Sequence, residues 1–126
     1  MKRLPAALAL AALILSPTFF VASCNSGSIY DEMSGAEVYK RLCSLCHGQE
    51  GRALTGTGAS YLGKRQYWSE QTLLEYIDNP AAYKQKAPHL PGKYMPAISR
   101  TVSAEARQKL VAHVLELMDA LEPASR

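Results

Sequence analysis

Apolar positions recur at helical spacing in three stretches of the chain, and the first of these begins at Ser34. Ser34 and Glu37 stand three residues apart at its start, which is the spacing of a capping box, in which each side chain accepts a hydrogen bond from the other residue's backbone N–H. The pattern therefore predicts a helix from this point onward. Its apolar face is made by Tyr39, Leu42, Cys43 and Cys46.

Two further helices are predicted downstream, each behind a serine that can cap it. The first covers residues 70–78 behind Ser69 and ends at Asn79-Pro80, because helical geometry is disfavoured for the residue before a proline. The second covers residues 104–121 behind Ser103. Its apolar positions form one continuous stripe, made by Leu110, Val111, Val114, Leu117, Met118 and Leu121.

The segments between these helices are rich in glycine and proline. Residues 48–67 hold five of the eight glycines, and residues 84–100 hold three of the seven prolines. Both segments are predicted to be long loops. No alternating pattern is long enough to predict a strand, so the expected fold class is all-α and loop-rich, with three main helices.

The chain begins with the features of a secretory leader. Lys2 and Arg3 precede a small-aliphatic stretch over residues 6–15, as in the basic and apolar regions of a signal peptide. This stretch is too short to cross about 30 Å of hydrocarbon as a helix. We therefore expect residues 1–23 to be a signal peptide, with an uncleaved membrane anchor as the alternative.

Cys24 makes this interpretation more specific. The sequence Val-Ala-Ser-Cys at residues 21–24 resembles the lipobox of bacterial lipoproteins, in which the cysteine becomes the lipidated first residue. Lipidation implies a protein held at a membrane surface without spanning it. Residues 24–33 are then a lipid-anchored tether and residues 34–126 the folded domain. The alternative is an ordinary export signal with a free thiol at Cys24.

The composition agrees with one small globular domain. The chain has 126 residues, of which 48% are hydrophobic and 20% charged, and its formal net charge is +3. These values exclude collagen-like, disordered and multispan membrane proteins. Three cysteines are too few for a disulfide scaffold, so their positions need another explanation.

Two of the cysteines stand in the sequence Cys43-Ser44-Leu45-Cys46-His47, which is the c-type haem attachment motif. Positions i, i+3 and i+4 share one side of a helical turn, so two thiols can bond the haem vinyl groups while the imidazole reaches the iron. A thioredoxin-like redox pair and half a zinc site are the alternatives, but no predicted strand precedes the motif and no second cysteine pair exists. The motif predicts one covalently bound haem c.

With this motif, the chain resembles class I cytochromes c over residues 34–121. The run from Trp68 to Tyr83 is similar to the mitochondrial-type members, and Pro-Gly-Lys-Tyr-Met at residues 91–95 resembles the loop that leads to their methionine ligand. The resemblance implies a small cytochrome c fold wrapped around one haem. It also implies three site roles: His47 and Met95 as the iron ligands, Trp68 as a hydrogen-bond donor to a haem propionate, and the Tyr76 hydroxyl near the Met95 sulfur.

The family pattern assigns roles outside the ligands as well. Gly35 and Tyr39 look like the pair that packs the first helix against the last. Family members usually carry a Gly-Pro pair whose proline carbonyl orients the proximal imidazole, whereas this chain has Gly58-Ala59. The Ala59 carbonyl can still accept a hydrogen bond from the imidazole Nδ1.

Four other residues compete with Met95 for the distal position. His89 is the main rival, because it lies in the predicted distal loop and imidazole binds ferric haem well. His113 is expected on the flank of the last helix or in a helix-crossing contact, Met118 in the apolar stripe of that helix, and Met33 exposed before the first helix. Met95 is the prediction, with His89 as the alternative.

The resemblance implies an electron carrier and no enzyme, because iron with both axial positions filled has no open site for a substrate. Two alternatives stay open: a gas-binding or peroxide-reactive haem protein with a displaceable distal ligand, and a haem subunit of a larger oxidoreductase. Lys84, Lys86 and Lys93 lie in a segment without acidic residues and predict a positive docking face for redox partners. No nucleic-acid partner is expected. We expect a monomer at the periplasmic or other extracytoplasmic face of a bacterial membrane.

Overall fold

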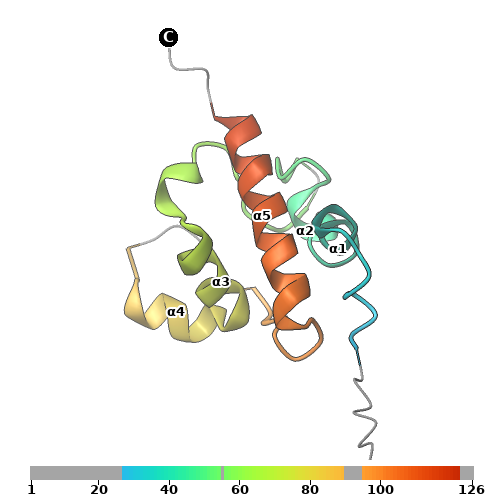
Figure 1. Cartoon of the computed structure of the whole chain (residues 1–126). Helices are drawn as coiled ribbons and strands as arrows, with labels where there is room; N and C mark the ends of the chain where they lie inside the picture. The colour runs from blue at the N-terminus through green and yellow to red at the C-terminus, as the bar shows by residue number, and fades with distance from the viewer. Residues whose placement is uncertain (1–26, 55, 90–94, 123–126) are drawn as a thin grey trace, which may run out of the picture.

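The computed structural model describes residues 27–54, 56–89 and 95–122, and within these ranges it contains helices and no strand. The predicted fold class is therefore confirmed. Figure 1 shows α5 running through the middle of the molecule, with α1 and α2 on one side and α3 and α4 on the other. The helices are α1 (Gly35–Leu42), α2 (Ser44–His47), the 3₁₀ helix η1 (Arg65–Tyr67), α3 (Glu70–Asp78), α4 (Pro80–Lys86) and α5 (Ala104–Leu121).

Capping residues determine where the three main helices begin. Ser34 and Glu37 form the predicted capping box: the serine Oγ accepts the Glu37 N–H at 3.3 Å, and the glutamate accepts the Ser34 N–H at 2.8 Å. Ser69 and Ser103 cap α3 and α5 in the same way, each accepting a backbone N–H of the first turn. Each such cap stabilises its helix by about 1 kcal/mol. All three predicted helix starts are confirmed.

The first helix ends earlier than the apolar pattern predicts. α1 stops at Leu42, and Cys43, with a φ of −115°, separates it from the short helix α2. The Cys43 N–H still donates to the Tyr39 carbonyl at 2.8 Å, and the Cys43 carbonyl accepts the His47 N–H at 2.9 Å. The chain therefore changes direction at Cys43 without losing these backbone hydrogen bonds.

The prediction of a loop over residues 84–100 is wrong at its start, because α4 extends to Lys86. Asn79 caps this helix, and its side-chain oxygen accepts a backbone N–H of the first turn at 3.1 Å. Pro80 suits the first helical position, where no hydrogen-bond donor is needed and φ is already correct. The Asn-Pro pair that ends α3 thus also begins α4. In the same way, η1 interrupts the predicted loop over residues 48–67.

α1 crosses α5 at Gly35, where the two backbones approach more closely than a side chain would allow. A Cβ built on Gly35 would lie 2.0 Å from the carbonyl oxygen of Lys109 on α5. Tyr39, one turn later, is buried in the crossing, and its ring meets the edge of the His113 ring with 5.4 Å between centroids. The expected packing of Gly35 and Tyr39 against the last helix is confirmed, as is the crossing contact expected of His113.

The apolar stripe of α5 is the centre of the core. α1, α3 and η1 all pack on this helix. Of the six predicted stripe residues, Leu117 is only partly buried, and the other five are buried: Leu110, Val111, Val114, Met118 and Leu121. Among the described residues, no helix is both long and apolar enough to cross a membrane.

Residues 28–33, part of the predicted tether, lie against the start of α5. Ser28 Oγ donates to a backbone carbonyl in the loop before α5 at 3.0 Å, and Lys109 Nζ donates to the Asp31 carbonyl at 2.9 Å. The cap serine of α5 donates to the Asp31 carboxylate. Met33 was expected to be exposed, and this expectation is wrong: the docked segment packs Met33 against the core, where it is half-buried.

We expect Gly35→Ala to lower the free energy of unfolding by about 1–3 kcal/mol, the usual effect of overpacking a close contact. The added Cβ cannot coexist with the Lys109 carbonyl unless the two helices separate. Ala36→Gly is the matched control, because it changes an exposed position of the same turn and costs at most about 1 kcal/mol of helix propensity. Chemical denaturation measures both values, and a fully stable Gly35→Ala protein would contradict the tight crossing.

Candidate functional site

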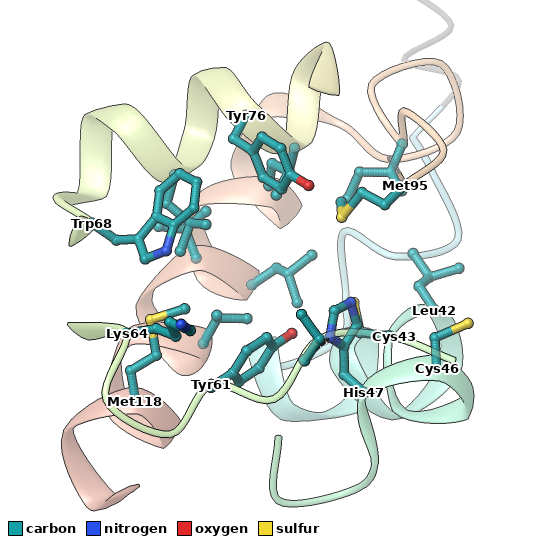
Figure 2. Close-up of a pocket in the computed structure, with 18 of the residues that line it drawn as sticks. Leu42, Cys43, Cys46, His47, Tyr61, Lys64, Trp68, Tyr76, Met95 and Met118 are labelled. Atoms are coloured by element: carbon teal, nitrogen blue, oxygen red, sulfur yellow. Dashed lines mark hydrogen bonds between the residues drawn. The ribbon is translucent and has the colours of Figure 1, made fainter. Parts of the chain in front are cut away.

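A cavity of about 290 Å³ lies between α5, α3 and the segment that carries α1 and α2. Apolar side chains of α3 and α5, among them Leu73, Ile77 and Val111, make most of its walls. Figure 2 shows side chains from several separate segments converging on this space. The lining includes all seven residues that the sequence analysis assigns to the haem site: Cys43, Cys46, His47, Ala59, Trp68, Tyr76 and Met95.

His47 is the last residue of α2, and the backbone holds its imidazole from one side. Nδ1 lies 2.8 Å from the carbonyl oxygen of Ala59, which is the contact expected of the Gly58-Ala59 pair. The Gly58 N–H donates to the Cys46 carbonyl at 2.8 Å and keeps this loop against α2. Because a carbonyl can only accept, Nδ1 carries a hydrogen, and in the neutral imidazole the lone pair is then on Nε2. The imidazole is therefore prepared to act as a ligand through Nε2.

Cys43 and Cys46 are free thiols at one end of the cavity (Figure 2). Cys43 is half-buried and Cys46 is exposed. Burial, together with the charge of Cys46, raises the pKa of the Cys43 thiol to about 11, so this thiol is protonated at neutral pH. Since no disulfide joins them, both sulfur atoms are available to bond a group in the cavity.

Met95 approaches the cavity from the side opposite His47. Figure 2 shows its sulfur directed into the space that the imidazole also faces, and its side chain packs partly buried against the core. His89 is exposed and outside the cavity lining, and His113 lies in the α1–α5 crossing. Met118 lines the cavity but is buried in the stripe of α5. The fold therefore brings Met95, and neither of the two other histidines, opposite His47.

Trp68 and Tyr76 form an aromatic wall of the cavity. Both side chains are buried, and their ring centroids are 5.1 Å apart. Tyr83 of α4 supports both from behind, at 5.8 Å from Trp68 and 5.7 Å from Tyr76. Burial raises the pKa of the Tyr76 phenol. Figure 2 shows the indole nitrogen and the phenol oxygen directed toward the cavity, so the wall presents two polar tips on an apolar surface.

Tyr61 and Lys64 also line the cavity, although no sequence pattern assigned them to it. Tyr61 stacks on the His47 ring, with 4.9 Å between centroids and 29° between planes. Lys64 lies at the end of the cavity near Trp68, away from the cysteines (Figure 2). Both residues come from a glycine-rich segment in which no periodicity shows which side chains turn inward. The available signals were an aromatic residue two positions after Ala59 and a cation four positions before Trp68.

The remaining site predictions concern residues that the structure describes only in part. Lys84 is half-buried and Lys86 exposed in the last turn of α4, whereas Lys93 lies outside the described residues. Cys24, the predicted lipidation site, also lies outside them. The positive docking face and the lipid anchor therefore stay predictions.

Comparison with known families shows what kind of domain surrounds the cavity. The model of the family described as cytochrome c oxidase, cbb3-type, subunit III matches residues 31–114. The chain belongs to this family. No curated protein and no solved structure matches the chain.

The matched segment contains every predicted site residue of the cavity and extends from before α1 into α5. It shows that the domain is a c-type cytochrome, the class of haem domain that transfers electrons. The predicted c-type cytochrome is thereby confirmed. The class I label and the lipoprotein signal stay predictions, because the family match does not test them.

Proposed function

We propose that this cytochrome domain is a monohaem electron carrier that is held at a membrane surface and passes single electrons between redox proteins. One observation carries the proposal: His47 and Met95 face the same apolar cavity from opposite sides, with Cys43 and Cys46 at one end. An imidazole and a thioether are the axial ligands by which proteins raise the potential of a c-type haem.

The cavity residues fit a haem in three separate respects. Apolar side chains of α3 and α5 line the walls, which suits the faces of a macrocycle. The two thiols stand at one end, where thioether bonds to vinyl groups would form. At the other end Trp68 offers an N–H and Lys64 an ammonium group (Figure 2), and both suit anionic propionates. The walls and both ends therefore match a planar group with apolar faces and one acidic edge.

The haem supplies the one-electron chemistry, and the protein supplies its ligands and surroundings. The Ala59 carbonyl keeps the hydrogen of His47 on Nδ1, so Nε2 stays available as a ligand in both oxidation states. The thioether of Met95 favours the ferrous state relative to a second imidazole. With His47 and Met95 as its two ligands, a bound haem iron would have no position left for a substrate. This arrangement favours electron transfer over catalysis.

We expect Met95→Ala to turn a carrier that ignores carbon monoxide into one that binds it stoichiometrically, because the distal position loses its ligand. The reduction potential should fall as well. Visible spectroscopy of the reduced protein with carbon monoxide and a redox titration measure both effects.

Met118→Leu is the matched control for Met95→Ala. It removes the other methionine sulfur of the cavity lining at nearly constant volume, so carbon monoxide should still not bind. If the wild-type protein itself binds carbon monoxide rapidly, the distal ligand is displaceable, and the gas-binding or peroxide-reactive function replaces the carrier.

We expect the haem to stay with the chain after unfolding in acid, because thioether bonds at Cys43 and Cys46 do not depend on the fold. Either single cysteine-to-alanine variant should retain one bond, and the double variant should release its haem. Denaturing mass spectrometry measures the attached mass in all four proteins. Release of haem from the unfolded wild-type protein would contradict covalent attachment.

The membrane part of the proposal rests on a lipid at Cys24, and the docked segment makes it more specific. Residues 28–33 lie against the start of α5, so only residues 25–27 separate the anchor from the folded body. Three residues span at most roughly 10 Å, whereas the whole predicted tether would reach about 20 Å. The domain therefore cannot move as far from the membrane as a free tether would allow.

The family match favours a second function, that of a fixed haem subunit in an oxidase. The matched family is named for subunit III of a cbb3-type cytochrome c oxidase. If the chain is a carrier that does not belong to an oxidase complex, the full-length chain extracted in mild detergent should elute apart from oxidase activity. Co-elution of the chain with a catalytic oxidase subunit at constant ratio would establish the subunit function instead.

A further inference from the structure

Tyr61 lies directly against the ring of His47. Their ring centroids are 4.9 Å apart and the planes differ by 29°, which is a stacked arrangement. The stacked face is separate from the Nδ1 edge, which the Ala59 carbonyl occupies. A single hydrogen bond at Nδ1 fixes the direction of one edge but leaves the imidazole free to tilt about that bond. The Tyr61 ring blocks this tilt on one side.

A neighbouring ring holds Tyr61 against the segment that carries His47. The Tyr61 and Tyr39 rings meet edge to face, with 6.3 Å between centroids and 63° between planes. The Tyr39 hydroxyl in turn donates to the Gly48 carbonyl at 2.8 Å. Gly48 directly follows His47 in the chain. The ring contact and this hydrogen bond thus form a relay that returns to the histidine.

The backbone leaves the Tyr61 ring little room to move. Its N–H donates to the Gly51 carbonyl at 2.8 Å, and a Cβ built on Gly51 would lie 2.2 Å from Tyr61 Cδ2. Gly51 also has a φ of +70°, a conformation that favours glycine. Tyr39, at the other end of the relay, is buried in the crossing of α1 and α5. The stacked ring is therefore connected to the most tightly packed contact of the fold.

We propose that Tyr61 is a positioning residue for the proximal ligand: its ring sets the plane of the His47 imidazole, and the relay through the Tyr39 ring holds the Tyr61 ring in place. The inference rests on the proposed function, in which His47 binds the haem iron. Neighbours that orient a metal-bound histidine also tune the metal it binds. A fixed imidazole plane keeps the iron's surroundings the same in both oxidation states, which a one-electron carrier needs.

The test compares holoproteins in which the ring or only the hydroxyl of Tyr61 is removed. Tyr61→Leu removes the stacking ring, whereas Tyr61→Phe keeps the ring and loses only the hydroxyl. Electron paramagnetic resonance of the ferric protein reports the imidazole plane through the g-values, and a redox titration reports the potential. We expect the largest g-value and the potential to shift in Tyr61→Leu and to stay near the wild-type values in Tyr61→Phe.

Two controls separate positioning from packing. Tyr67→Phe changes an exposed residue of η1, and Val102→Ala shortens a buried side chain outside the cavity lining. Val102→Ala should lower the melting temperature without changing the g-values. If Tyr61→Leu behaves like Val102→Ala, the inference is overturned, because Tyr61 then only packs. Should Tyr61→Leu fail to fold, Tyr61→Ile takes its place, and wild-type g-values in that variant overturn the inference.

The wild-type spectrum keeps the two failures apart. A low-spin ferric signal that is lost in His47→Ala supports the proposed function before any Tyr61 variant is compared. A wild-type signal that survives His47→Ala overturns the proposed function, and this inference with it. Unchanged Tyr61 variants on a wild-type signal that depends on His47 overturn the inference alone.

Discussion

The close approach of Gly35 to the Lys109 carbonyl is the contact on which the rest of the domain depends. It lets α1 cross α5 without an intervening side chain, which buries Tyr39 in the crossing. Because α2 follows α1 after a single residue, the crossing also decides where Cys43, Cys46 and His47 lie relative to the apolar stripe of α5. The same helix contact thus places the two thiols and the His47 imidazole relative to the cavity wall that α5 provides.

Around this frame, loops hold the functional groups through backbone atoms. The Ala59 carbonyl accepts from His47 Nδ1, and the Gly58 N–H binds the Cys46 carbonyl. A backbone acceptor is available whatever the side chain, which explains how alanine can stand where related cytochromes carry proline. This arrangement is common in proteins, in which a rigid scaffold positions loops that carry many of the functional groups.

The polar groups of the site are distributed as an electron carrier needs. The walls between α3 and α5 are mostly apolar, so they would screen a change of charge at a bound iron less than water does. The polar tips stand at defined places: the indole of Trp68 and the ammonium of Lys64 at one end, the thiols at the other (Figure 2). With the proposed lipid at Cys24, the docked segment before α1 would hold this site near the membrane surface.

Much of the fold and site could be predicted from the sequence, because the signals were local. Caps at Ser34, Ser69 and Ser103 and the stripe of α5 depend on residues three or four positions apart, and so does the Cys43–His47 motif. α4, the docking of residues 28–33 and the inward turn of Tyr61 and Lys64 depend on packing between distant segments. The same is true of the placement of Met95, and not His89, opposite His47. Local spacing determines which helices form and which chemistry they can carry, whereas only the packing of those helices decides which loop residues reach the cavity.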